Sequence, residues 1–238
     1  MVEFIIGKKV LVDVIKLACV MKTPKSRGII DTIEFDVQKG QMIVKGIDNG
    51  GTVMSCVRVF MDENNVKEIG TFVYAPKELM NKINYFGDEL VVRIDDENIY
   101  VTDTNGETSH QDALPNVTLD FPVDFRILED KILPEEDIEV THKTIVKSAP
   151  PKLGKDVHLY FGQNGFSIGH EDELTKFQKR LGSEKFDEEL KIKLDGNFFD
   201  KITSVIGDEF ILGANEDIVF LYTREDWGDV AYMMSTLA

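Results

Sequence analysis

The chain has 238 residues, a comfortable length for two domains of roughly 100–120 residues each. We expect no membrane span, because no stretch approaches the roughly 20 apolar residues that a spanning helix needs. The net charge is −16, from 27 basic and 43 acidic residues. Because Lys and Arg supply most of the affinity for phosphates, this average argues against nucleic acid as a partner unless the basic residues gather on one part of the surface.

The first predicted helix covers Lys8 to Met21. Lys9, Asp13 and Lys16 share one of its faces, because positions i, i+4 and i+7 of a helix superpose. Most other positions are apolar, so we expect this helix to be buried on all sides but one. From Lys8 to Arg27 the sequence holds six basic residues and a single acid, which reverses the average of the chain.

Two later segments resemble each other. Residues 72–90 and 192–210 each contain a strand pattern, an amphipathic helix pattern, Gly-Asp-Glu and a further strand pattern, with the two Gly-Asp-Glu motifs 120 positions apart. Pro76 favours the first turn of the earlier helix, where Lys77 lies opposite the apolar face. In the later helix Lys201 lies on the polar face. The chain is therefore interpreted as a degenerate repeat.

The beginnings of the two halves support this repeat. The first helix is followed by strand patterns and a hairpin turn at Lys39-Gly40, and a helix pattern from Thr141 to Ala149 is followed by strand patterns and a turn at Asn164-Gly165. We predict an α+β protein of two similar domains, residues 1–114 and 138–238, each with two helices packed on antiparallel sheets.

Residues 115–137 separate the two predicted domains. They contain three prolines, an acidic run at Glu135-Glu136-Asp137 and an apolar series from Phe121 to Leu128. Because proline is excluded from the interior of a sheet, we interpret this segment as an extended connector that crosses the protein surface. A plain edge strand followed by a tail is the alternative.

Basic residues concentrate on the polar sides of the four predicted helices, and acidic residues on the strands, turns and connector. The stretch from Thr141 to Lys155 has four lysines and no acid. Lysines on the exposed face of a single helix are common in any soluble protein. Four helices with lysine-rich polar faces in an acidic protein favour contact with phosphates. No aromatic platform or base-reading arginine accompanies the lysines, so the pattern indicates binding without sequence recognition.

Known catalytic motifs are absent. The sequence has neither a Gly-x-x-x-x-Gly-Lys-Ser/Thr phosphate loop nor a Gly-x-Gly-x-x-Gly motif, and its four histidines lack metal-ligand spacing. Asp95-Asp96-Glu97 is interpreted as a turn between strands instead of a metal site. Cys19 and Cys56 lie in apolar runs and are expected to be buried thiols. We expect no signal peptide, no enzymatic activity, no cofactor and no metal.

Several short motifs add to the repeat, the lysine-bearing helices and the acidic connector. Gly46-Ile47-Asp48-Asn49 follows a strand, paired aromatics precede Lys201 in Asn197–Ile202, and the last hairpin has Asp226-x-Gly228-x-x-x-Tyr232. With the strand pattern at residues 157–160, these features resemble the PCNA-type DNA sliding clamps over nearly the whole chain. The ending, residues 232–238, departs from the family's common ending. The connector is also similar to that of trimeric clamps of large tailed phages, so a cellular and a viral origin both stay open.

The resemblance implies a homotrimer of two-domain subunits that closes into a six-domain ring around double-stranded DNA. Edge strands of neighbouring subunits would pair, and the ring would tether a replicative DNA polymerase after a clamp loader has placed it. Candidates for facing DNA, without sequence preference, are Lys8, Lys9, Lys16, Lys77, Lys82, Lys143, Lys147, Lys152, Lys155 and Lys201. Such a protein would work in the cytoplasm or nucleoid, in the host cytoplasm if viral, or in the nucleus if eukaryotic.

The resemblance also implies a docking pocket for partner peptides between the loop after the second strand, the connector and the C-terminal strand. Its candidate residues are Ile47, Asp48, Phe125, Ile127, Leu128, Met233 and Met234. The connector residues could instead simply pack on their own domain. Three other functions stay open: a clamp-fold transcription coactivator or checkpoint ring, a monomeric polymerase accessory factor, and an unrelated enzyme of mixed α and β structure.

Overall fold

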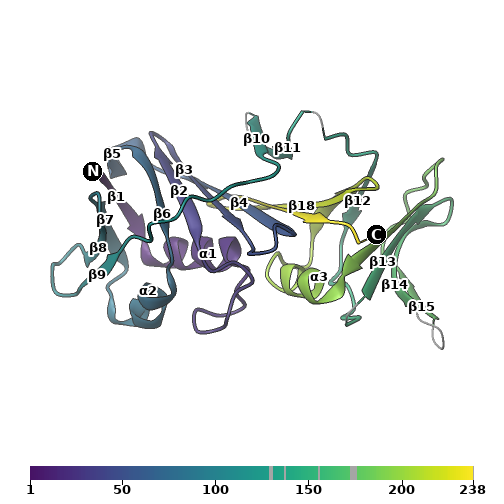
Figure 1. Ribbon diagram of the computed structural model, residues 1–238, viewed down its shortest axis with the longest axis horizontal. Helices are drawn as coiled ribbons and strands as arrows, with labels where there is room; N and C mark the ends of the chain where they lie inside the picture. Colours follow the sequence, from purple (N-terminus) through teal and green to yellow (C-terminus); the bar gives the residue numbers. More distant parts are fainter. Residues whose placement is uncertain (129–130, 137, 155, 172–175, 238) are drawn as a thin grey trace. The chain divides into compact units, whose positions relative to one another are not determined.

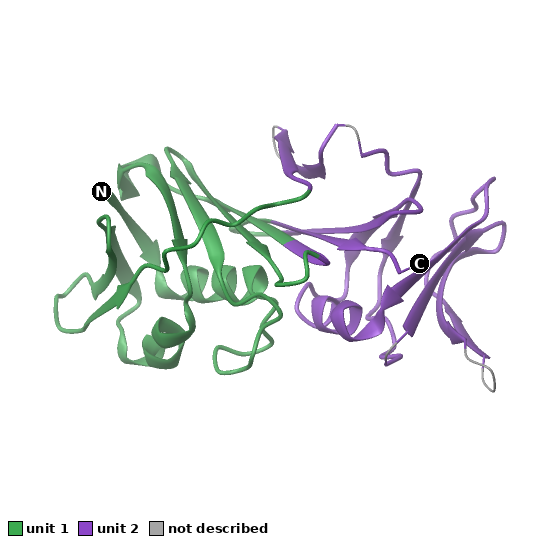
Figure 2. Ribbon diagram, in the orientation of Figure 1, with its two compact units in different colours: residues 1–51, 55–122, 225–229 green, residues 52–54, 123–224, 230–238 purple. Residues whose placement is uncertain are grey.

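A computed structural model describes residues 1–128, 131–136, 138–154, 156–171 and 176–237. The chain forms two compact units (Figure 2). Unit 1 comprises residues 1–51, 55–122 and 225–229, and unit 2 comprises residues 52–54, 123–224 and 230–238. The chain leaves unit 1 for unit 2 after residue 122, inside the predicted connector, and each unit also takes in a short piece from the other part of the sequence.

Unit 1 combines two helices with two groups of antiparallel strands (Figure 1). One group has the order β5-β1-β7-β8-β9 and the other the order β4-β3-β2-β6. The elements are β1 (Val2–Gly7), α1 (Lys8–Ala18), β2 (Ile33–Gln38), β3 (Gln41–Ile47), β4 (Val53–Phe60), β5 (Val66–Glu68), β6 (Gly70–Tyr74), α2 (Lys77–Lys82), β7 (Glu89–Ile94), β8 (Asn98–Asp103) and β9 (Ser109–Ala113), with short 3-10 turns at Glu63–Asn65 and Ile83–Tyr85.

The core of unit 1 lies between its helices and strands. Leu11 and Ile15 of α1 and Leu79 of α2 are buried against the strands, where the rings of Phe35 and Phe72 stack with centroids 4.8 Å apart. Burying a side chain of this size contributes about 1.5–3 kcal/mol. The predicted apolar faces of both helices are therefore confirmed.

A buried ion pair ties the β18–β19 turn into unit 1. The guanidinium of Arg58 on β4 donates to Asp229 Oδ2, with Nε at 2.9 Å, and both side chains are at most 2% exposed. Gly228 fits beside them because any Cβ there would lie 1.8 Å from the carbonyl oxygen of Arg58. This arrangement fixes residues 225–229 against β4, since a buried charge without its partner is strongly destabilising.

Unit 2 has strand groups in the orders β15-β14-β13-β16 and β12-β17-β18-β19, and a separate hairpin of β10 and β11. Its elements are β10 (Phe125–Leu128), β11 (Lys131–Pro134), β12 (His142–Val146), β13 (Asp156–Gly162), β14 (Gly165–Glu171), β15 (Lys176–Arg180), β16 (Leu190–Asp195), α3 (Gly196–Thr203), β17 (Phe210–Ala214), β18 (Ile218–Glu225) and β19 (Gly228–Ser235). The hairpin turns predicted at Lys39-Gly40 and Asn164-Gly165 are confirmed, with positive φ at both glycines.

The helix predicted from Thr141 to Ala149 is wrong, and α3 is the only helix among the described residues of unit 2. The segment forms β12, in which His142, Thr144 and Val146 are buried while the residues between them are exposed. This alternation with a period of two, together with β-branched side chains, favours a strand. The α+β class is correct, but the second unit has one helix where two were expected.

Candidate nucleic-acid interface

The three candidate lysines of α1 differ in whether their charge is already engaged by another group of the chain. Lys8 donates from Nζ to the carbonyl oxygen of Phe86 at 2.7 Å, and Lys16 lies 3.3 Å from Asp13 one turn earlier. Lys9 is exposed and makes no ion pair with any described residue. Of the three candidates on this helix, Lys9 is therefore the one whose charge is not already engaged within the chain.

The candidate lysines of α2, the second helix of unit 1, are more exposed to solvent than those of α1. Lys77 and Lys82, at the two ends of α2, are exposed and form no ion pair within the described parts of the chain, whereas Leu79 and Met80 between them are buried. Lys82 also lies close enough to His110 on β9 to help lower the pKa of that imidazole, after the larger effect of burial. Both ends of α2 thus carry a cation that forms no ion pair with a described carboxylate, although Glu78 lies on the same helix.

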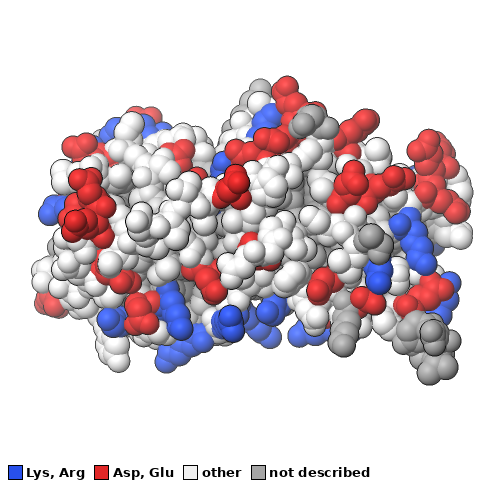
Figure 3. Space-filling model, viewed as in Figure 1, with Lys and Arg blue, Asp and Glu red and all other residues white. Residues whose placement is uncertain are grey.

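Three further basic residues join this surface from the loop between α1 and β2. Lys22, Lys25 and Arg27 are exposed, and none has an ion-pair partner among the residues described. Figure 3 shows Lys and Arg side chains gathered along the lower border of unit 1, on the side of α1, α2 and this loop. They were not among the candidates named from sequence, although the excess of six basic residues over one acid between residues 8 and 27 was the signal.

In unit 2, α3 carries Lys201 on its exposed face. Asp195 caps the helix, because its Oδ1 accepts from the backbone N–H of Asn197 at 2.8 Å. Gly154 packs against the start of α3, since a Cβ on Gly196 would lie 1.8 Å from the carbonyl oxygen of Gly154. Burial raises the pKa of Asp200 on this helix, partly opposed by backbone N–H groups of residues 153 and 154 and by the positive charge of Lys152.

The remaining basic candidates of unit 2 lie on extended backbone. Lys143 is exposed on β12, Lys147 is exposed just after it, and Lys152 is exposed beside α3. Lys155 lies outside the described residues. The structure therefore places Lys152 and Lys201 on the same side of unit 2, around α3, and leaves Lys143 and Lys147 on and beside a strand.

The candidate docking residues are distributed over both units. Ile47 and Asp48 are half-buried at the end of β3 in unit 1, where Asp48 accepts from the N–H of Gly50 at 3.0 Å. In the β10–β11 hairpin of unit 2, Phe125 is buried, Ile127 is half-buried and Leu128 is 45% exposed. Within that hairpin, Leu128 is thus the candidate that presents the most apolar surface.

Met233 and Met234, the last two docking candidates, lie on β19 and are at most 1% exposed. Their side chains do not reach the surface of the chain. The first seven residues of β19 are all buried, and successive residues of a strand point to opposite faces, so both faces of β19 are covered. The expectation that these two methionines line an exposed pocket is therefore not supported by their burial.

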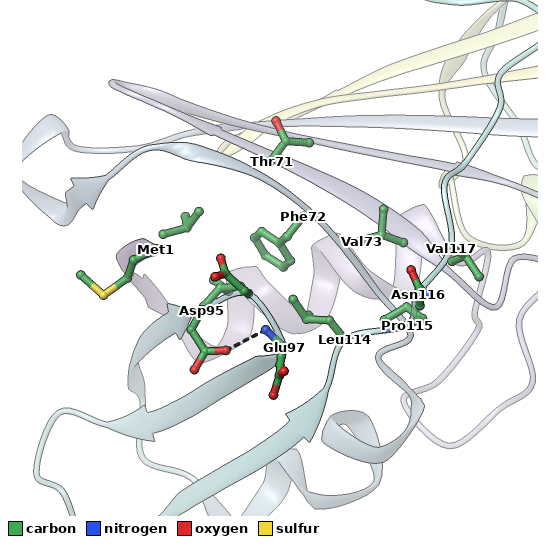
Figure 4. Close-up of a pocket in the computed structure, with 13 residues that line it drawn as sticks. Met1, Thr71, Phe72, Val73, Asp95, Glu97, Leu114, Pro115, Asn116 and Val117 are labelled. Carbon is green, nitrogen blue, oxygen red and sulfur yellow. Dashed lines mark hydrogen bonds between the residues drawn. The ribbon is translucent and has the colours of Figure 1, made fainter.

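A pocket of about 590 Å³ on unit 1, called here the acidic pocket, has the opposite charge from the helix surface. It lies between β6, the start of β1, the β7–β8 turn and residues 114–117, and Asp95, Asp96 and Glu97 all line it (Figure 4). The N–H groups of Glu97 and Asn98 donate to Asp95 Oδ1 and hold the pKa of this carboxyl below its usual range. The predicted turn at residues 95–97 is confirmed, and its charge would repel phosphates.

Two strands at the edges of sheets carry complementary charge. β15 is an edge strand of unit 2 whose five residues are all exposed, including Phe177 at 47% and three basic side chains. β9 is an edge strand of unit 1 that contains Asp112 and follows Glu107. Exposed edges of this kind are templates for pairing with another chain.

The described residues can also be compared with the requirements of metal binding, membrane insertion and thiol chemistry. No group of three or more metal-ligating side chains occurs there, and none of the described helices has the length and apolar character to cross a bilayer. Both cysteines are buried, and burial raises the pKa of the Cys19 thiol. The buried thiols predicted from sequence are confirmed.

No protein-family model matches the sequence, and no curated protein matches it. The fold is similar to solved structures of PCNA. In the structure of A. fulgidus PCNA with the C-terminal region of FEN-1 bound, the similarity covers 100% of this chain and 99% of the other, with a TM-score of 0.73 and 12% identity. For PCNA from Thermococcus kodakaraensis it covers 100% of both chains, with a TM-score of 0.69 and 15% identity. The chain therefore has the PCNA-type clamp fold predicted from its sequence.

Proposed function

We propose that this protein is a DNA sliding clamp, a non-enzymatic ring that encircles duplex DNA and confers processivity on a replicative DNA polymerase. The observation that carries the proposal is the concentration of unpaired basic side chains on the helix side of unit 1 in a chain of net charge −16. Weak, screened contacts with phosphates permit sliding, and the closed ring instead of affinity prevents escape. The PCNA-type fold supports the same function.

The ring would form by head-to-tail pairing of edge strands in a homotrimer. Three cations on β15 face solvent, while β9 carries and follows acidic residues, so the two edges attract each other electrostatically. A contact between different surfaces of identical chains closes into a ring when the rotation between subunits permits it. Pairing would also remove two exposed strand edges from solvent.

Partner proteins would dock through short peptides with apolar and aromatic anchors. The half-buried Ile127 and the exposed Leu128 of the β10–β11 hairpin support this part of the proposal, with Ile47 and Asp48 as further candidates. A polymerase and a clamp loader are the expected partners. We retain residues 1–114 and 138–238 as the two functional domains and residues 115–137 as their connector.

Topological retention on DNA tests the proposal. Linear duplex is fixed to a bead at one end, the protein is allowed to thread on, and the free end is then blocked with a bulky protein before a wash at high salt. A ring is retained only on blocked DNA, because high salt removes contacts with phosphates but not a topological link. Equal loss from blocked and open DNA, or equal retention on both, would contradict the clamp and favour a monomeric accessory factor.

A further inference from the structure

A second pocket of unit 1, called here the basic pocket, has a volume of about 500 Å³ and lies between the α1–β2 loop and the start of α2. Its floor includes the buried side chains of Cys19 and Met21. Its rim carries the exposed cations of Lys25, Arg27 and Lys77. Three positive charges thus surround a cavity whose floor is apolar.

These cations are not neutralised within the chain. None of the three forms an ion pair or side-chain hydrogen bond with another described residue. Asp31 is the one carboxylate that lines the pocket, so three positive charges face a single negative one. Like charges held close together repel each other, and an anion that enters the pocket relieves this repulsion.

The loop that carries Lys25 and Arg27 is fixed by internal hydrogen bonds. The carbonyl oxygen of Cys19 accepts from the N–H groups of Ile29 at 3.0 Å and Ile30 at 3.3 Å. Gly28 allows this closure, because a Cβ there would lie 2.3 Å from the same carbonyl oxygen. A loop that is ordered before binding loses little conformational entropy when a ligand arrives.

A second set of bonds holds the tip of the loop. The Ser26 hydroxyl donates to the carbonyl oxygen of Thr23 at 2.8 Å and accepts from the Thr23 N–H at 2.9 Å. Ser26 and Asn81 also line the pocket and supply further polar groups there. The cations on this loop therefore project from a defined frame.

We propose that the basic pocket binds one phosphate group of the nucleic-acid backbone, with its sugar near the apolar floor. The planar guanidinium of Arg27 suits two parallel hydrogen bonds to phosphate oxygens, and Lys25 and Lys77 add charge from both sides. The nucleic-acid source of this phosphate rests on the proposed clamp function. Unit 1 then makes one localised phosphate contact in addition to a diffuse contact from Lys9 of α1.

Salt dependence of duplex binding tests this assignment in the full chain. Arg27→Gln and the double variant with Lys25→Gln are compared with Lys67→Gln, which removes one charge from exposed β5 of the same unit and so serves as the matched control. Affinity falls as salt rises, and removing one cation that neutralises a phosphate makes the slope of log affinity against log salt less steep by about 0.9. Because a homotrimer carries the pocket three times, we expect Arg27→Gln to make the slope less steep by about one for each of its pockets that holds a phosphate, the double variant to make it less steep by about twice as much, and Lys67→Gln to leave it unchanged.

Nuclear magnetic resonance distinguishes a phosphate of DNA from free inorganic phosphate as the ligand. The Arg27 Nε–H signal is followed while duplex DNA or inorganic phosphate is added. A shift with DNA at concentrations where inorganic phosphate gives none supports the proposal. A shift with inorganic phosphate alone, or equal slopes for Arg27→Gln and Lys67→Gln, overturns it. If topological retention fails while DNA still shifts the Arg27 signal, the clamp function is overturned but the phosphate site remains.

Discussion

Units 1 and 2 arrange similar strands and helices, yet they carry their positive charge on different secondary structure. In unit 1 the free cations lie on α1, on α2 and on the loop between α1 and β2. In unit 2 one lies on α3, and Lys143 and Lys147 lie on and beside a strand. Both units therefore present a positively charged surface. Its cations can lie on a helix or on an extended segment.

The units also differ in how ion pairs contribute to their stability, and the largest predicted effect comes from this difference. Replacing Asp229 by Ala leaves Arg58 of unit 1 as a buried charge without its main partner. We expect Asp229→Ala to lower the free energy of unfolding by about 3–5 kcal/mol. Urea unfolding followed by circular dichroism measures the loss.

The matched variant in unit 2 is Asp156→Ala. Asp156 lies 3.6 Å from Lys193, and the two side chains are 41% and 39% exposed. Ion pairs on the surface contribute about 0–1 kcal/mol, so this variant is expected to unfold almost as the unchanged protein does. A loss at Asp156→Ala as large as that at Asp229→Ala would break the contrast between a buried and an exposed pair.

The two edge strands give the next largest effect. Replacing Phe177 of β15 by Glu removes an exposed apolar side chain and adds a negative charge where β9 is expected to pair. Because about half of the Phe177 surface is already covered within the chain, losing the burial of the rest weakens each interface between chains by about 0.8–1.5 kcal/mol, roughly fourfold to twelvefold in dissociation constant. Light scattering should show three times 27.0 kDa for the unchanged chain and a lower mass for Phe177→Glu.

Tyr85→Glu is the control, since Tyr85 is 78% exposed in unit 1 but lies on neither edge strand. It should keep the mass of the unchanged chain at every concentration. A strict monomer before any substitution, or the same mass for Phe177→Glu as for Tyr85→Glu, would argue against ring closure through β15.

The sequence predicted many of the strands, the two hairpin turns and three of the four expected helices, because those segments have a clear period and suitable turn residues. It failed at residues 141–149, which were interpreted as a helix although the β-branched Thr144, Ile145 and Val146 favour the strand that forms. The sequence does not indicate which segments distant along the chain lie side by side, nor the positive φ of Val20 just before the basic loop. The basic pocket could not be predicted for the same reason.

Candidate site residues were predicted less completely than strands. Charge bias along the chain identified Lys9, Lys77 and Lys201 as exposed cations, because position on an amphipathic helix determines exposure. It could not show that Lys8 is engaged by the carbonyl oxygen of Phe86, 78 positions away. Tertiary contacts of this kind decide which lysines are free.

The smallest predicted effect compares one buried histidine in each unit. His110 of β9 and His158 of β13 are each 9% exposed, and Nε2 of the first and Nδ1 of the second lack a hydrogen-bond partner among the described residues. Burial lowers the pKa of both, assisted by Lys82 near His110 and by Lys191 near His158.

Because the folded-state pKa lies below the unfolded value, the unfolded chain binds protons first as pH falls through about 6.5, and stability is lost from there towards lower pH. His110→Gln and His158→Gln should each make the free energy of unfolding less dependent on pH between about 7 and 5, and the double variant should combine the two effects. Urea unfolding at several pH values measures this slope. An unchanged slope in the double variant would mean that carboxylates alone cause the acid sensitivity of both units.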